Sequence, residues 1–204
     1  MMNACTRWSF LAVPVLAAFG CSDPVPLPAQ GAVTLGLQGP TENVTQMSCP
    51  IGAGTSYAVG AKEKVGTITM SQSPTAGTPG QSVIDGDGDT TVSCSVRKQA
   101  DGSFKVSGSL HAASSSGDPI TVSLINVVIS PDLTTGSGEV SVFTPQLAGT
   151  FDSGTAPCAF TVVNKQVKGG SIWSKFTCPS ISQPPSSLCS IADSWIVFEN
   201  CSGS

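Results

Sequence analysis

Runs in which apolar and polar residues alternate recur along the chain and predict β-strands. The clearest run is Thr90–Val96, whose valines and cysteine fall on one face and whose serines fall on the other. A period of two residues is typical of a strand with one buried face. A turn at residues 100–103 leads to Phe104–Leu110, which alternates in the same way. Together the two runs predict a β-hairpin.

Clusters of Gly, Ser, Pro and Asp separate further runs of the same kind. Residues 120–129 are apolar on both sides in the second half of the run, which predicts a central strand. The additional predicted strands are Ala32–Gln38, Ile120–Ile129, Val140–Phe143, Ala159–Val163, Ile172–Phe176 and Ser194–Glu199. Residues 39–79 are less regular and form a predicted irregular excursion, in which Val44–Cys49 and Val65–Met70 are candidate strands.

No stretch carries a helical apolar stripe longer than about two turns. The pattern therefore predicts an all-β protein with one antiparallel β-sandwich domain at residues 32–204. We expect roughly nine strands in a jelly-roll-like or immunoglobulin-like arrangement.

The composition agrees with this prediction. Only 11% of the 204 residues are charged, and strand and turn formers outnumber good helix formers. The formal net charge is −4. Nucleic-acid binding requires a basic surface, so no nucleic-acid partner is expected.

The first residues have the features of an export signal. Arg7 precedes the apolar stretch Trp8–Phe19, which is too short to cross a bilayer. Small Gly20 then stands directly before Cys21. Residues 1–20 are therefore predicted to be a signal peptide.

The run Leu16–Cys21 resembles a bacterial lipobox, with Ala18 in place of the usual leucine. This resemblance implies that the thiol of Cys21 is acylated and that Cys21 becomes the new N-terminus. The alternative is ordinary signal peptidase cleavage, which Ala18 and Gly20 would also suit and which would leave Cys21 as a free thiol.

Residues 21–31 contain spaced prolines and are predicted to be an extended tether between a lipid anchor and the folded domain. Ser22, rather than Asp, follows Cys21. By resemblance to the sorting rule of Gram-negative lipoproteins, this residue implies the outer membrane, with the domain on its periplasmic or surface face.

The cysteines independently indicate export. Of 8 cysteines, Cys5 lies in the predicted signal and Cys21 is the predicted anchor, so 8 − 2 leaves six. An even number in an exported chain predicts three disulfides. The pairing that we predict is Cys49–Cys94, Cys158–Cys201 and Cys178–Cys189. The last pair would close a short Pro-rich loop, and Cys158 and Cys201 would face each other across antiparallel strands.

The acidic cluster Asp85–Asp89 alternates carboxylates with glycines and resembles the beginning of a calcium-binding loop. The following residues depart from the EF-hand pattern, because Thr90 stands at the position where that pattern has Gly and Val96 at the position where it has Glu. A solvated turn is the favoured interpretation. Asp85, Asp87 and Asp89 are thus weak metal candidates, and no tight calcium site and no cofactor are predicted.

His111 is the only histidine and is predicted to face solvent from its strand. No Gly-x-Ser-x-Gly elbow and no second histidine for a zinc pair accompany it. No pair of carboxylates stands out for glycoside hydrolysis. We therefore predict a non-enzymatic protein, and an enzyme that uses only carboxylates remains a third alternative.

Aromatic residues are few, and two are weak candidates for ligand binding. Trp173 alternates with Ile172 and Phe176 and could face outward, and Tyr57 lies in a predicted loop. Exposed rings of this kind stack on sugars, so an adhesion or carbohydrate-binding module is the alternative function. The competing interpretation is that such a tryptophan is buried or covers a sheet edge.

The pattern Trp173-x-x-Phe176-x-Cys178-Pro179, followed by Cys189 and Phe198-Glu199-Asn200-Cys201, resembles the C-terminus of small uncharacterised lipoproteins of Gram-negative bacteria, myxobacteria among them. That resemblance implies a class and a location but no activity. The expected function is a non-catalytic binding or structural role in a lipid-anchored outer-membrane or periplasmic lipoprotein. Its expected partner is the membrane, through the N-terminal lipid, and whether it also binds a protein or a glycan is left open.

Overall fold

The computed structural model describes residues 26–39, 49–51, 55–59, 82–114, 117–184 and 187–203. The predicted signal peptide, the predicted anchor Cys21 and the first part of the predicted tether lie outside these residues. So do the candidate strand Val65–Met70 and all of Val44–Cys49 except its last residue.

The described residues are almost entirely β-structure, and every pairing between named strands is antiparallel. This confirms the predicted fold class, with eleven strands where roughly nine were expected. The strands are β1 Gln30–Gln38, β2 Thr55–Val59, β3 Val83–Ile84, β4 Thr91–Lys98, β5 Phe104–Ala113, β6 Pro119–Ile129, β7 Thr135–Thr144, β8 Gly149–Asp152, β9 Cys158–Lys168, β10 Ser171–Gln183 and β11 Ser187–Glu199. A single 3-10 turn, Pro145–Leu147, connects β7 to β8.

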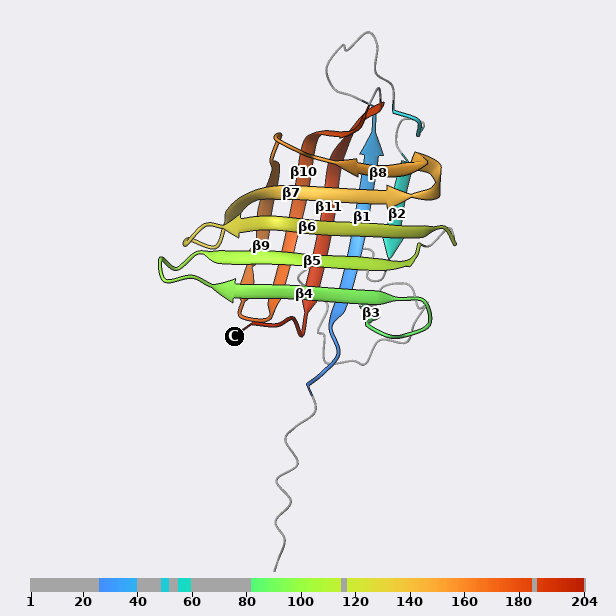
Figure 1. The fold of residues 1–204 in the computed structure, drawn as a ribbon. Coiled ribbons are helices and arrows are strands. Elements are labelled where there is room, and N and C mark those ends of the chain that lie inside the picture. Colours follow the sequence, from blue (N-terminus) through green and yellow to red (C-terminus); the bar gives the residue numbers. More distant parts are fainter. Residues whose placement is uncertain are drawn as a thin grey trace, which may run out of the picture.

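The strands form two layers that run crosswise to each other, as Figure 1 shows. One layer contains β2, β1, β11, β10 and β9, and the other contains β8, β7, β6, β5 and β4. The layers are joined at one side, where β9 pairs with both β10 and β7. Strands β4 to β8 follow one another as a meander, rather than in the Greek-key order of a jelly roll or an immunoglobulin domain.

The core lies between the two layers and is filled by alternate residues of each strand. In the predicted hairpin, the inward residues Val92, Val96, Val106 and Leu110 are all buried, as expected. The largest buried side chains include four phenylalanines, two of which stack with their ring centroids 5.7 Å apart. The hydrophobic pattern therefore determines which face of each strand the core covers.

The predicted turn between β4 and β5 is also confirmed. The carboxylate of Asp101 accepts hydrogen bonds from the backbone N–H of Ser103, at 2.9 Å, and from its hydroxyl, at 2.6 Å. These bonds lower the pKa of the Asp101 carboxyl. Gly102 adopts the left-handed backbone conformation, with φ of 87°, that such a turn requires.

The described residues contain three disulfides, as predicted, but each predicted pairing is wrong. The observed bonds are Cys49–Cys189, Cys94–Cys201 and Cys158–Cys178. The segment after Cys178 is not a loop, because β10 continues to Gln183 and β11 begins at Ser187. Across this hairpin Cys178 is opposite Ile191, so it does not meet Cys189.

The register between β9 and β10 explains the bond that Cys178 does form. Thr177 pairs with Ala159, which brings the adjacent Cys158 and Cys178 together with their Cα atoms 4.2 Å apart. Pro179 lies in β10 where the pairing with β11 shifts register, and such an irregularity tolerates a residue without an N–H.

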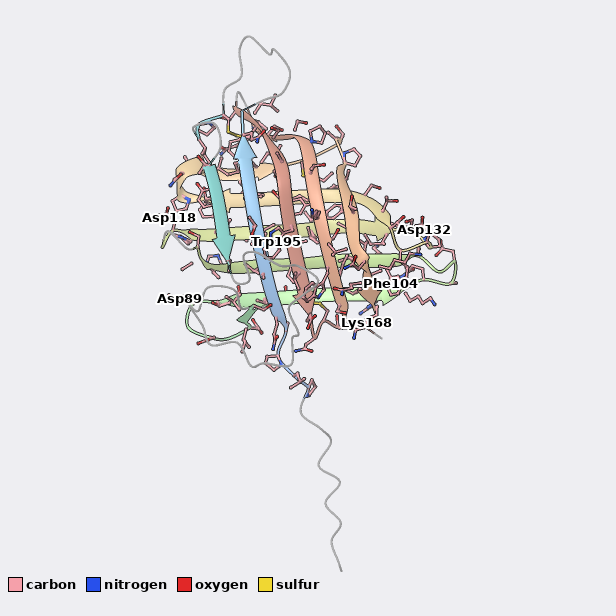
Figure 2. All side chains as sticks on the ribbon, turned by 180° about the vertical axis from the view of Figure 1, so that it is seen from behind. Asp89, Phe104, Asp118, Asp132, Lys168 and Trp195 are labelled. Atoms are coloured by element: carbon pink, nitrogen blue, oxygen red, sulfur yellow. A yellow bond between two sulfur atoms is a disulfide. The ribbon has the colours of Figure 1, made fainter. Side chains whose placement is uncertain are left out.

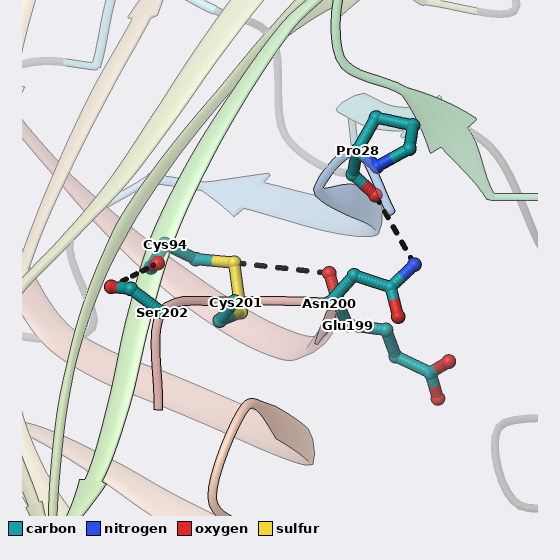
Figure 3. The surroundings of a disulfide bond; sticks show 6 residues. All are labelled: Pro28, Cys94, Glu199, Asn200, Cys201 and Ser202. Carbon is teal, nitrogen blue, oxygen red and sulfur yellow. Dashed lines mark hydrogen bonds between the residues drawn. A yellow bond between two sulfur atoms is a disulfide. The ribbon is translucent and has the colours of Figure 1, made fainter. Parts of the chain in front are cut away.

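The C-terminal segment after β11 links the two layers (Figure 3). Cys201 is bonded to Cys94 of β4, and Ser202 exchanges backbone hydrogen bonds with the same strand. At the other side of this segment, the N–H of Cys201 donates to the carbonyl of Gly170, in the turn between β9 and β10. We call residues 200–203 and their disulfide the C-terminal clip.

Candidate functional site

The outer surface of β4–β8 carries an ordered array of hydroxyl side chains. Ser93, Ser109, Ser123 and Ser141 are cross-strand partners and form one row over four strands. The Ser123 hydroxyl donates to the Ser109 hydroxyl at 3.0 Å. This surface, which we call the serine-threonine face, consists of the outward residues Thr91, Ser93, Ser95, Arg97, Lys105, Ser107, Ser109, His111, Thr121, Ser123, Ile125, Val128, Ser137, Glu139, Ser141, Phe143, Thr150 and Asp152.

A second row runs parallel to the serines and contains the histidine. Thr91, His111, Thr121 and Phe143 are successive cross-strand partners. Nδ1 of His111 lies 2.8 Å from the hydroxyl oxygen of Thr121, and the ring is half-buried. The prediction that His111 lies on the outward side of its strand is confirmed. Thr91 and Thr121 place one hydroxyl group on each side of the ring in this row.

Four serines surround a shallow hollow within this face. Ser93 and Ser95 of β4 and Ser107 and Ser109 of β5 line a depression of about 400 Å³, together with Leu124 and neighbouring residues. The hollow is wide and open, so it offers several hydroxyl groups to a surface rather than enclosing a small molecule.

Exposed apolar side chains are concentrated on the same face. Among the described residues, the large apolar side chains that are exposed are Leu27, Ile125, Val128 and Phe143, and the last three belong to β6 and β7. Their exposed fractions are 39%, 47% and 36%. Ile125 and Val128 lie in neighbouring rows on β6, whereas Phe143 lies two rows from Ile125. Adjacent exposed apolar residues mark an interaction site more often than scattered ones do.

The prediction that Ile120–Ile129 is a central strand holds in part. β6 lies between β5 and β7, and its inward residues are fully buried. Its outward face, however, leaves Ile125 and Val128 exposed, next to an irregularity in which Asn126 has a φ of 50°. The apolar residues on both sides of this run in the sequence therefore mark an exposed apolar surface on β6 as well as its buried face.

Charged residues divide the serine-threonine face into two halves. Arg97 and Lys105 are cross-strand partners on β4 and β5. Glu139 lies on β7 and Asp152 on β8. The face is therefore basic toward β4 and acidic toward β8.

Trp173 is not an exposed ring. It belongs to the outer side of the other layer, and only 5% of its surface is exposed. That side of the layer faces the viewer in Figure 2. It belongs to a small apolar cluster with Ala32 and Val197, against which Val163 and Trp195 pack. Trp173 therefore fits the competing interpretation, in which the tryptophan is buried, and it offers no exposed ring for sugar stacking.

The indole of Trp173 has a polar partner. Its Nε1 donates a hydrogen bond of 2.7 Å to Oε1 of Glu199. Burial raises the pKa of this carboxyl, and the indole N–H and the charge of Lys168 oppose the shift without cancelling it. Lys168, Glu199 and Asn200 line a hollow of about 340 Å³ beside the turn between β9 and β10.

Tyr57 is also buried. It lies in β2 rather than in a loop, only 2% of its surface is exposed, and its hydroxyl donates to the side-chain oxygen of Gln146 at 2.7 Å. Tyr57 belongs to the core between the layers, whereas Trp173 belongs to the outer cluster. The two candidate aromatics do not form a common site.

The Asp85–Asp89 cluster forms the turn between β3 and β4, as predicted. Oδ1 of Asp85 accepts a hydrogen bond of 2.8 Å from the backbone N–H of Val92, so this carboxylate holds the turn. Asp87 and Asp89 are exposed. In the part of the chain that the structure describes, no three His, Cys, Asp or Glu residues gather into a group able to hold a metal ion.

No helix among the described residues is both long and apolar enough to cross a membrane. No family model matches the chain, and neither the curated proteins nor the solved structures contain a significant match to it.

Proposed function

We propose that this chain is an exported, lipid-anchored protein of the outer membrane, with a non-catalytic binding or structural role on its periplasmic or surface face. The three disulfides indicate an oxidising compartment. The lipobox-like run ending at Cys21 and the prolines that follow it support an anchor and a tether.

The binding role rests on one observation, the serine-threonine face. Rows of hydroxyl groups and three exposed apolar side chains lie together on one layer. On the outer side of the other layer, the comparable residues Ala32, Trp173 and Val197 are buried. A glycan is the less favoured ligand, because the tryptophan and the tyrosine that could have stacked on sugars are buried.

Metabolic labelling with radioactive palmitate tests the anchor. The wild-type chain is expected to incorporate the label and the variant Cys21→Ala to lose it, because lipidation proceeds through that thiol. Cys5→Ala is the matched control and should retain the label, since Cys5 lies in the segment that is removed. Label that persists in Cys21→Ala would contradict the anchor.

Photo-crosslinking in cells tests the binding role. A p-benzoylphenylalanine at exposed Ser137, next to Val128 on the serine-threonine face, should yield a discrete crosslinked product. The same group at Lys175, which is exposed on the other layer, is the control and should yield much less. Equal yields at the two positions, or no product at Ser137, would refute a binding role for this face.

A further inference from the structure

We propose that the partner of the serine-threonine face is a second copy of this chain, packed face to face as a two-fold symmetric dimer. The inference rests on the proposed binding role of this face. It is carried by the shape of the face, by the position of its exposed apolar residues and by the division of its charges.

The face can approach another sheet closely. One central row, formed by the cross-strand serines of β4 to β7, has only short side chains, and two β-sheets pack with their backbones about 10 Å apart. Small side chains allow that distance, and each exposed hydroxyl can donate to and accept from a hydroxyl of the partner.

The apolar residues favour one symmetry axis. Ile125 and Val128 both lie on β6, the middle strand of β4–β8. A two-fold axis that runs along β6, in the plane between the two faces, lays each β6 on the β6 of the other copy. These apolar side chains then cover their own equivalents, as an isologous interface requires.

The same axis makes the charges complementary. It places β5 of one copy over β7 of the other, so Lys105 faces the partner's Ser137, and its long side chain can reach the partner's Glu139 one residue row away. The basic edge of each copy, with Arg97, faces the acidic edge of the other, which carries Asp152. The attraction occurs twice in the dimer, whereas any arrangement that superposes equivalent edges would bring like charges together.

The size of the face predicts a weak, reversible dimer. Strands about 4.8 Å apart and residue rows about 6.8 Å apart give a surface of roughly 20 Å by 20 Å. Closing it would bury on the order of 1,000 Å² in total, which is the lower end for specific interfaces. Attachment of both copies to one membrane would favour such a dimer by raising their effective concentration.

The test uses full-length chains expressed in cells, with the crosslinking group at Ser137 and two different C-terminal tags. Lys105→Glu alone and Glu139→Lys alone should each reduce the doubly tagged dimer band at least tenfold, because both symmetric contacts become repulsive. Co-expression of the two variants should restore the band to within twofold of wild type, because both contacts are then attractive. Val128→Asp should abolish it, and Lys175→Glu on the other layer should leave it unchanged.

The composition of the crosslinked product separates this inference from the proposed function. A band with both tags that follows the charge exchange supports the dimer. A product at Ser137 that contains a different molecule refutes the dimer but preserves the binding role. A doubly tagged band that is insensitive to Lys105→Glu and Glu139→Lys refutes the proposed geometry, and the absence of any product refutes both proposals.

Discussion

At the scale of single residues, a hydrogen bond joins Trp173, which belongs to a small buried apolar cluster, to the half-buried Glu199. The carboxylate satisfies the indole N–H, which would otherwise be buried without an acceptor. In return, the surrounding apolar groups disfavour the ionised carboxyl and raise its pKa. The interaction therefore orients the indole but leaves a charge in a poorly solvated place at neutral pH.

The unfavourable burial of the Glu199 charge predicts a stabilising substitution. Because the folded state raises the pKa of Glu199, folding favours the protonated carboxyl. The stability that the protonated carboxyl contributes is complete below the ordinary pKa of 4.5, and it is lost as the pH rises through the raised pKa. Glu199→Gln keeps an acceptor for Trp173 without the charge. It should stabilise the fold at pH 7 by about 0.5 kcal/mol, allowing for solvent screening, and the gain should disappear below pH 4.

Urea unfolding at pH 7 and pH 4 measures this effect. Glu139→Gln is the control, since that side chain is exposed and its substitution should give no comparable pH-dependent gain. A Glu199→Gln variant that is less stable than wild type at pH 7 would show that the charge is favourable where it lies.

The close packing around Gly138 predicts that a larger residue there is destabilising. A Cβ at this position would lie 2.5 Å from the Cα of Val127, because Gly138 pairs with β9 and faces the register shift of β6 between Ile125 and Val128. Gly138→Ala should therefore destabilise the fold by about 1–3 kcal/mol. Gly39→Ala, where a Cβ would meet no atom within 4 Å, should change the unfolding midpoint much less. Equal effects of the two substitutions would contradict the proposed steric cause.

At the scale of elements, the strands that could be predicted are those whose alternation is carried by side chains. Residues 104–110 are of this kind, and they lie in β5 as expected. The sequence prediction did not include the first half of β7. Gly136 and Gly138 occupy its inward positions, and without apolar side chains there the alternation of a strand is not visible. Strands β2, β3 and β8 were missed because they are short.

The candidate site was less predictable than the strands, for a physical reason. Which serines form a row depends on the register between strands, and a local pattern does not contain that register. The disulfide pairing failed for the same reason, because the partner of Cys178 follows from the pairing of Thr177 with Ala159. Burial of Trp173 depended on contacts with β1 and β11, which are distant in sequence.

The geometry of the Asp85–Asp89 turn predicts that it does not bind calcium tightly. Asp85 already accepts a backbone hydrogen bond from Val92, and Val96 stands where a calcium loop would supply a bidentate acid. Calorimetric titration with calcium should therefore show no micromolar binding, and Asp87→Ala should give the same trace as wild type. Micromolar affinity that Asp87→Ala removes would overturn this prediction.

At the scale of the whole molecule, the layers are joined on one side by β9 and on the other by the C-terminal clip. β4 is the last strand of its layer, and an open edge of this kind presents unpaired backbone groups. The clip occupies part of that edge. The N–H of Val96 donates to the carbonyl of Ser202, and the N–H of Ser202 donates to the carbonyl of Cys94.

The clip depends on the bond between Cys94 and Cys201, which closes a sequence separation of 107 residues. The double variant Cys94→Ala/Cys201→Ala should lower the free energy of unfolding by about 2–4 kcal/mol, because the unfolded chain regains its freedom. It should also release the edge of β4, so amide hydrogen exchange at Val96 should accelerate strongly. The double variant Cys158→Ala/Cys178→Ala is the control, because that bond joins β9 to β10 and leaves the contacts of Ser202 with β4 in place.

The two variants separate a local effect from a global one. Loss of the Cys94–Cys201 bond should accelerate exchange at Val96 more than at Val106, which lies one strand further into the layer and is fully buried. Loss of the Cys158–Cys178 bond should not produce this difference. If Val96 remains as protected without the Cys94–Cys201 bond as with it, the backbone hydrogen bonds to Ser202 hold the edge without the disulfide. Closure of the sandwich at β4 is then independent of the oxidising compartment.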